Sequence, residues 1–143
     1  MKSFIVFVFV CCIIGLSESL SKEQRVEMFL KMANECAKKE GATSADVDEL
    51  AAHKAASGKG GKCIRACIAE NVGIMKNNQV DVEGTVNVAT MAFEGDANKV
   101  QTARDLASAC VSETDSDRCE AAAKIFACGR SVAKDRGLSF DDL

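Results

Sequence analysis

The chain has 143 residues, a formal net charge of -3, and no proline, tryptophan or tyrosine. Without proline, helices can run uninterrupted, and few large aromatic residues are available for the cross-strand pairs that stabilise sheets. We therefore expect an all-α protein. Nucleic acid is not expected as a partner, because the longest basic run is the pair Lys38 and Lys39.

The first 19 residues have the charged start, apolar middle and small-residue exit of a secretory signal peptide. Lys2 precedes an unbroken apolar run, Phe4–Leu16, and the segment closes at Ser19. This run is shorter than the roughly 20 residues that a membrane-spanning helix needs. We predict cleavage near Ser19, secretion to the extracellular space, and one helical domain over residues 20–143.

Two helices are expected in the first part of this domain. Ser21 and Gln24 form a capping box for the first, which runs to about Lys39 and is stopped by Gly41. Ser44 is expected to cap the second. Apolar residues recur at helical spacing in both, at Val26, Phe29, Leu30, Ala33 and Ala37, then at Val47, Leu50 and Ala51.

A third helix is expected around Cys63. The glycine-rich sequence SGKGGK, residues 57–62, predicts a flexible loop leading into this helix, and Gly73 is placed to end it. The pair Asn77 and Asn78 then predicts a turn.

Three more helices follow. Asp81 is expected to cap the fourth, residues 94–98 (EGDAN) form a turn into the fifth, and the sixth runs from near Ser116 to before Gly137. Their inward residues are Val82, Val86, Ala89 and Phe93 in the fourth, and Val100, Ala103, Leu106 and Cys110 in the fifth. The sequence thus predicts six helices and a short tail, residues 138–143.

The cysteines favour disulfides. Removing Cys11 and Cys12 with the signal peptide leaves six of the eight cysteines in the secreted chain. An even number of cysteines outside the cell indicates disulfides before metal ligands. No closed zinc-ligand spacing is present, so no metal is expected.

Helix geometry excludes some disulfide pairings. Cys119 and Cys128 are nine residues apart on one predicted helix, which separates them by roughly 13 Å, too far for a disulfide. Cys63 and Cys67 point the same way along another helix, so a bridge between them would distort the backbone. Ten of the 15 possible pairings of six cysteines stay open.

The cysteine spacing closely resembles that of a known family. The six cysteines are separated by 26, 3, 42, 8 and 8 residues, as in the insect odorant-binding proteins, also called the pheromone and general odorant-binding family. The resemblance covers the whole secreted chain. It implies six helices around a closed apolar cavity, stapled by three interlocked disulfides, which would be Cys36–Cys67, Cys63–Cys119 and Cys110–Cys128.

The resemblance also implies a function. Members carry odorants, pheromones or similar small hydrophobic molecules in the fluid around olfactory neurons, the sensillum lymph. The expected partner is therefore a small hydrophobic ligand, with an olfactory receptor membrane complex as a further candidate, and the expected state is a monomer or weak homodimer without a cofactor. Two alternatives stay open: a non-olfactory carrier of the same fold, and a saposin-like lipid-transfer protein, whose cysteine spacing differs.

Helical phase gives a set of candidate cavity residues. They are Phe29, Met32, Ile68, Met75, Val86, Phe93, Leu106 and Phe126, with Phe140 from the tail as a lid. Thr90 is the one weak hydrogen-bond donor expected among them, so ligands should be held by shape and dispersion. The acidic tail, acting towards pH 4 to 5, and His53, acting at a higher pH, are the two candidate triggers of ligand release, and a tail with no role in release is the third possibility.

The sequence argues against an enzyme. His53 is the only histidine, and it lies among alanines and lysines with no serine or cysteine motif beside it. Acid–base or nucleophilic catalysis usually needs a base near a nucleophile. We therefore expect no catalytic residues.

Overall fold

The computed structural model describes residues 21–138. The predicted signal peptide, Phe140 and the tail aspartates lie outside these residues, so the expectations for them stay predictions. Six helices and one hairpin are present in the described part: α2 Lys22–Glu40, α3 Ser44–Ala51, α4 Lys59–Val72, β1 Met75–Lys76, β2 Gln79–Val80, α5 Val82–Ala92, α6 Ala97–Ala109 and α7 Arg118–Asp135. The expected all-α fold is confirmed. No helix between residues 21 and 138 is long and apolar enough to cross a membrane.

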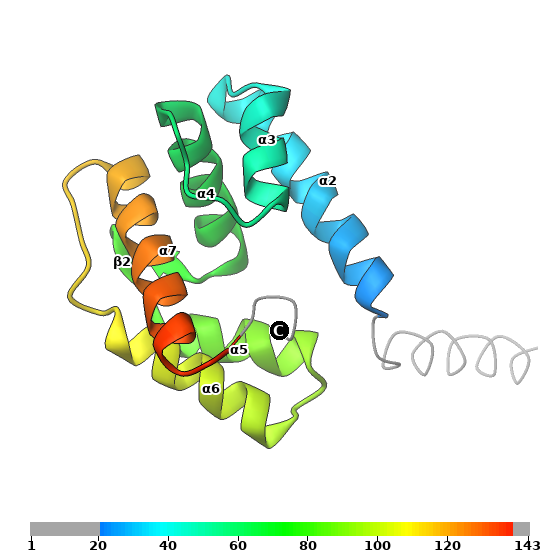
Figure 1. Cartoon of the computed structure of the whole chain (residues 1–143), viewed down its shortest axis with the longest axis vertical. Helices are drawn as coiled ribbons and strands as arrows, with labels where there is room; N and C mark the ends of the chain where they lie inside the picture. The colour runs from blue at the N-terminus through cyan, green and yellow to red at the C-terminus, as the bar shows by residue number, and fades with distance from the viewer. Residues whose placement is uncertain (1–20, 139–143) are drawn as a thin grey trace, which may run out of the picture.

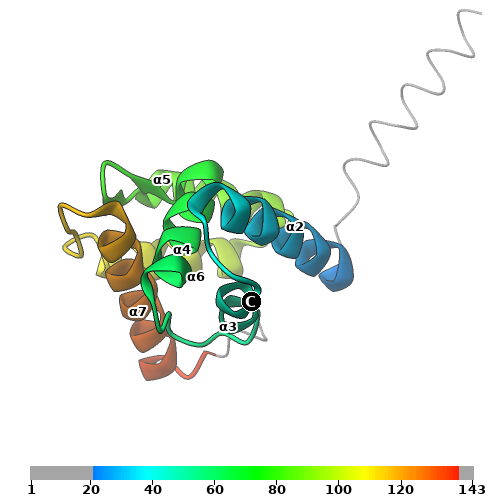
Figure 2. The same ribbon diagram turned by 90° about the horizontal axis from the view of Figure 1, so that it is seen from above.

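Helix α4 lies at the centre of the molecule. It packs against α7 on one side and against α2 and α3 on the other, as both views show (Figure 1, Figure 2). Helices α5 and α6 pack on each other and lie across one end of α7 (Figure 1). Consistent with this position, eight consecutive or near-consecutive residues of α4 are buried, from Gly61 to Ala69.

Side-chain caps set most helix starts. The predicted capping box of α2 is confirmed, with Ser21 and Gln24 each binding the other's backbone N–H. The cap of α3 is Thr43, one residue before the predicted Ser44, because Asp46 completes a second capping box with it. Likewise Asp117, not Ser116, accepts the first N–H groups of α7.

The loop predicted at residues 57–62 is wrong in its last four residues. Helix α4 begins at Lys59, so two of the three glycines that suggested flexibility, Gly60 and Gly61, lie inside it. Glycine disfavours a helix by up to about 1 kcal/mol, yet here its lack of a side chain permits close packing. A Cβ on Gly60 would overlap the Asp46 carboxylate of α3, and one on Gly61 would lie 3.1 Å from the Ala56 Cβ.

A short hairpin follows α4. The predicted turn at Asn77 and Asn78 is confirmed, and both have positive φ, 53° and 61°, as the tightest hairpin turns require. The two-residue strands around it were not predicted, since Met75, opposite Val80, is the only fully buried strand residue. Phe93 and the later Cys110 cap the C-termini of α5 and α6 instead of lying within these helices.

The disulfides are those that the family resemblance implied. They are Cys36–Cys67, Cys63–Cys119 and Cys110–Cys128, with Cα separations of 5.8, 4.5 and 5.9 Å. The first two tie α4 to α2 and to α7, and the third ties the end of α6 to α7. Among the described helices, α2, α4, α6 and α7 are therefore each joined to another helix by a disulfide, whereas α3 and α5 are not. The hairpin directly follows α4, one of the joined helices.

Two apolar clusters form the core on either side of α4. One joins α2, α3 and α4 through Ala33, Cys36, Ala37, Val47, Leu50, Ile64, Cys67 and Ile68. The other joins α4, β1 and α7 through Ala66, Ala69, Met75, Ala121, Ala122 and Ile125. The many alanines let α4 and α7 approach closely.

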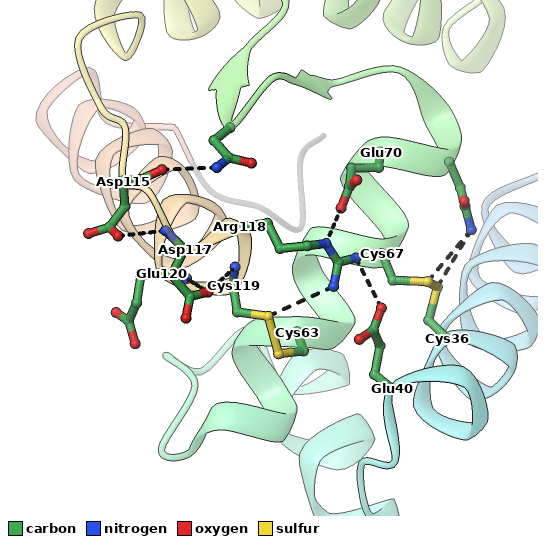
Figure 3. A network of polar contacts seen from close by, with 12 residues as sticks. Cys36, Glu40, Cys63, Cys67, Glu70, Asp115, Asp117, Arg118, Cys119 and Glu120 are labelled. Carbon is green, nitrogen blue, oxygen red and sulfur yellow. Dashed lines mark hydrogen bonds and ion pairs between the residues drawn. A yellow bond between two sulfur atoms is a disulfide. The ribbon is translucent and has the colours of Figure 1, made fainter.

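Arg118 connects three helices at the disulfide-rich side of α4. Its guanidinium lies 3.0 Å from a Glu40 oxygen of α2 and 2.7 Å from a Glu70 oxygen of α4 (Figure 3). The Cys119 sulfur is 3.9 Å away. Hydrogen bonding to Glu40, with a further contribution from Glu70, raises the pKa of Arg118 above its ordinary value. This network adds charge pairing where two disulfides already fix the helices.

Candidate ligand-binding cavity

A cavity of about 220 Å³ lies between α2, α3, α4 and α7. Its apolar wall consists of Phe29 from α2, Leu50 from α3 and Phe126 from α7. Leu50 belongs to the α2–α3–α4 cluster, and Phe126 packs against the α4–α7 cluster. The cavity therefore lies where the two parts of the core meet, and its walls are fixed by both.

The other four residues that line the cavity are basic or can become so. They are His53, Lys54, Arg65 and Arg130. The expectation of a cavity with few strong donors is therefore wrong for this space. Thr90, the predicted donor, is exposed and donates to the Val86 carbonyl oxygen of its own helix.

Arg65 is the buried charge of the group. Only 4% of its surface is exposed, and it is the only buried charged residue between residues 21 and 138. Its Nη1 donates to the Gly61 carbonyl oxygen at 3.0 Å, and its Nη2 donates to that of Lys54. Burial, and secondarily the positive charge of Arg130, lower the pKa of Arg65. A guanidinium keeps its proton in proteins nonetheless.

Two of the basic lining residues, His53 and Lys54, lie in the connection between α3 and α4. His53 has a positive φ of 57°, and its carbonyl oxygen accepts a hydrogen bond of 3.0 Å from Arg130 on α7. Glu49 accepts the Ser57 N–H at 3.1 Å, and hydrogen bonding to Ser57 lowers the pKa of Glu49. These bonds fix the connection that supplies His53 and Lys54 to the cavity lining.

Two of the predicted cavity residues, Phe29 and Phe126, line this space. The others lie elsewhere. Met32 and Ile68 belong to the α2–α3–α4 cluster, and Met75 to the α4–α7 cluster. Val86 is buried in α5, Leu106 is half-buried in α6, and Phe93 lies at the end of α5.

Phe93 has surroundings of its own. The Arg25 guanidinium of α2 lies 5.6 Å from the centre of its ring, and the Lys99 ammonium of α6 lies 4.9 Å away. Cation–π attraction at such distances stabilises the contact between the α5–α6 pair and α2. The ring therefore serves a contact between helices in this structure.

Sequence reasoning missed Leu50 as a cavity residue, and it missed all the basic ones. One signal could have indicated Arg65. It interrupts the apolar run CIRACIA, residues 63–69, where a charged residue is rarely tolerated in a buried helix without a purpose. Arg130 and Lys54 have no comparable signal, because arginine and lysine are ordinary on helix surfaces and in loops.

The cavity volume limits the ligand. About 30 Å³ is the share of one water molecule in the liquid, so 220 Å³ corresponds to about seven such volumes. A wider hollow of about 570 Å³ runs beside Lys22, Val26 and Leu30, but its walls come from α2 alone. Of these two spaces, the cavity at Arg65 is the one bounded by several elements.

Comparisons with known proteins agree on one family. The model of the PBP/GOBP family matches residues 18–131. General odorant-binding protein 28a of Drosophila melanogaster is 32% identical over 126 residues, 87% of this chain and 88% of that protein. General odorant-binding protein 19d of the same fly is 27% identical over 135 residues, 93% of this chain and 90% of that protein.

Solved structures give the same picture. Odorant-binding protein dmelOBP28a from Drosophila melanogaster superposes with a TM-score of 0.70 at 32% identity, covering 83% of this chain and all of that one. Fatty acid binding protein OBP56a from the oral disk of the blowfly Phormia regina gives a TM-score of 0.60 at 24% identity, covering 83% of this chain and 98% of that one. The second likeness establishes the fold alone.

Proposed function

This chain is a member of the PBP/GOBP family, and from that membership we propose that it carries small hydrophobic molecules in the cavity between α2, α3, α4 and α7. The observation that carries the proposal is the partly open space between four helices, with an apolar wall of Phe29, Leu50 and Phe126. Relatives that cover most of the chain are named odorant-binding proteins. Binding, not catalysis, is the role that this family supports.

The disulfides suit a hollow protein. A closed, empty cavity costs roughly 24 cal/mol per Å³, which sets an upper bound of about 5 kcal/mol for this partly open space of 220 Å³. Each disulfide stabilises a small secreted domain by about 2 to 4 kcal/mol. Three of them can therefore offset the cost of the cavity, and a bound ligand removes part of that cost.

Secretion and the tissue of action belong to the proposal. The signal-peptide pattern of residues 1–19 supports an extracellular location, and odorants or pheromones are the ligands that the relatives' names suggest. An olfactory receptor complex is the membrane partner that such a carrier would serve. A non-olfactory carrier of the same fold remains the alternative, and family membership disfavours the saposin-like one.

Displacement of a fluorescent apolar probe tests the carrier function. About seven buried carbons at about 0.8 kcal/mol each contribute about 6 kcal/mol before the costs of association and the gains from polar contacts. We therefore expect dissociation constants between about 1 and 100 μM for alcohols, aldehydes and acids of six to ten carbons. Failure of every such compound to displace the probe below about 100 μM would count against a carrier role.

A further inference from the structure

Among residues 21–138, no carboxylate gives Arg65 the counter-charge that a buried cation normally has. Among the described residues, Arg104, Arg118 and Arg136 each lie within 4 Å of a carboxylate oxygen. Arg65 is far more buried than these, yet among the described residues its hydrogen bonds go to two backbone carbonyl oxygens. Burying an ion without a counter-charge is costly. A buried guanidinium that lines a cavity therefore points to an anion that arrives with a ligand.

A second guanidinium faces the same space. Arg130 lines the cavity from α7, and its bond between residues 21 and 138 is to the His53 carbonyl oxygen. Arg130 is close enough to lower the pKa of Arg65 by charge repulsion. Lys54 and His53 also line the cavity. Two like charges held together without a carboxylate between them make a strong field for an anion.

The nearest acidic groups on α3 are committed to other bonds. Glu49 and Asp46 act on Arg65 at longer range, and neither forms an ion pair with it within 4 Å. Glu49 accepts the Ser57 N–H, and Asp46 accepts the N–H and hydroxyl of Thr43. These carboxylates balance part of the charge at a distance without occupying the donors of Arg65.

The geometry of an arginine suits a carboxylate. A guanidinium has five N–H donors in one plane, and two of those on Arg65 bind backbone carbonyls. The remaining donors match the two oxygens of a carboxylate better than the single oxygen of an alcohol or aldehyde. In the same cavity, Phe29, Leu50 and Phe126 offer an apolar wall for an alkyl chain.

Resting on the proposed carrier function, we propose that this cavity is selective for medium-chain monocarboxylates. The carboxylate binds Arg65 and Arg130 at the basic side, and the alkyl chain lies against Phe29, Leu50 and Phe126. A volume of about seven water molecules fits the seven-carbon tail of octanoate, with its head among the cations. The ligand supplies the counter-charge that no carboxylate of residues 21–138 gives Arg65.

Three ligands of equal chain length separate charge from hydrophobicity. Calorimetric titration of the oxidised protein with octanoate, 1-octanol and octylammonium should give an octanoate affinity at least ten-fold above that of octanol. Octylammonium should bind more weakly than both, because it meets like charge. Arg65→Met should weaken octanoate at least ten-fold and leave octanol within about three-fold. Arg130→Met, at a less buried position, should act in the same direction.

The controls keep the proposal open to refutation. Arg118→Met makes the same chemical change away from the cavity and should leave the preference intact, while Arg65→Lys should recover part of it. Circular dichroism confirms that each variant is folded. Equal affinities for octanoate and octanol, or a preference that survives in both Arg65→Met and Arg130→Met, would overturn the proposal. If octanol binds and octanoate has no advantage, the carrier function stands alone, and if no ligand binds, the carrier function fails too.

Discussion

Two arginines on adjacent helices have opposite surroundings. Arg118, at the start of α7, lies between Glu40 and Glu70 and beside the Cys119 sulfur (Figure 3). Arg65, in the middle of α4, is buried beside Arg130 and has no carboxylate within 4 Å among the described residues. Their pKa values move accordingly, upward for Arg118 and downward for Arg65.

The different surroundings of the two arginines indicate different roles: Arg118 stabilises the fold, and Arg65 binds the ligand. Carboxylates from two other helices neutralise Arg118, so its charge contributes to holding α2, α4 and α7 together. The charge of Arg65 is placed where the fold gains little from it, since an unpaired buried ion reduces stability. Replacing Arg118 should therefore lower the free energy of unfolding, and replacing Arg65 should lower the affinity for ligands.

The largest effect is expected at the disulfide beside Arg118. The Cys63→Ser, Cys119→Ser double variant opens a loop whose ends are 56 residues apart, and loop entropy gives a loss of about 4 kcal/mol in unfolding free energy. Urea denaturation monitored by circular dichroism measures it. The Cys110→Ser, Cys128→Ser variant, with ends 18 residues apart, should lose less, about 3 kcal/mol. Equal losses, or a smaller loss at Cys63, would contradict this order.

A smaller loss is expected for Arg118→Met. The change leaves Glu40, whose side chain is only 15% exposed, without its cation, and we expect a loss of about 1 to 2 kcal/mol in unfolding free energy. Arg104→Met is the matched control, because the Arg104 pair with Glu83 is exposed and such pairs contribute at most about 1 kcal/mol. If both variants lose the same amount, the network of Arg118 has no special role.

Acid should modestly reduce the stability that carboxylates contribute near Arg118 and near the cavity. Hydrogen bonding to Lys124, assisted by the Asp117 N–H, lowers the pKa of Asp115 near Arg118, and bonding to Ser57 lowers that of Glu49 near the cavity. A carboxyl with a lowered pKa in the folded state stabilises the fold above its unfolded pKa, about 4, and this stability is lost as pH falls through the folded value.

Variants without these carboxylates measure how much each carboxylate stabilises the fold at a given pH. The gap in melting temperature between the wild type and Asp115→Asn, and between the wild type and Glu49→Gln, should therefore be largest near pH 6 and should narrow by pH 3. Thermal unfolding at the two pH values measures it. A gap that stays constant over this range would show that neither carboxylate gains a lowered pKa on folding.

Much of the fold could be predicted from the sequence. Local signals such as the Ser21 and Gln24 box, Gly73 and the Asn77–Asn78 turn need only neighbouring residues, and all three are confirmed. The start of α4 was misread because tertiary packing decides whether Gly60 and Gly61 bend or continue a helix. The disulfide pairing needed the family resemblance, since helix geometry left ten pairings open.

The cavity was harder to predict. Apolar periodicity identifies residues that face inward, and it cannot tell a packed residue such as Ile68 from a cavity wall such as Phe126. The basic side depends on contacts between distant segments, such as Arg130 with the carbonyl of His53. Such contacts leave no periodic signal, and only Arg65, alone in its apolar run, was marked in the sequence.

The central claim is that Arg65 acts on ligands while Arg118 acts on the fold. The most direct test is the unfolding free energy of Arg65→Met and Arg118→Met with and without octanoate. At about 100 times the wild-type dissociation constant, octanoate should add about 2.7 kcal/mol to the wild type. Arg118→Met should have a lower unfolding free energy without ligand, and octanoate should raise it by the same amount as in the wild type.

Arg65→Met should behave in the opposite way, with its ligand-free stability kept and its gain from octanoate reduced. Its stability without ligand should equal or exceed that of the wild type, because methionine replaces an unpaired buried charge. The octanoate increment should fall to about 1.4 kcal/mol or less, since binding is at least ten-fold weaker. Equal octanoate increments in the two variants, or a large loss of ligand-free stability in Arg65→Met, would contradict the division of roles between the two arginines.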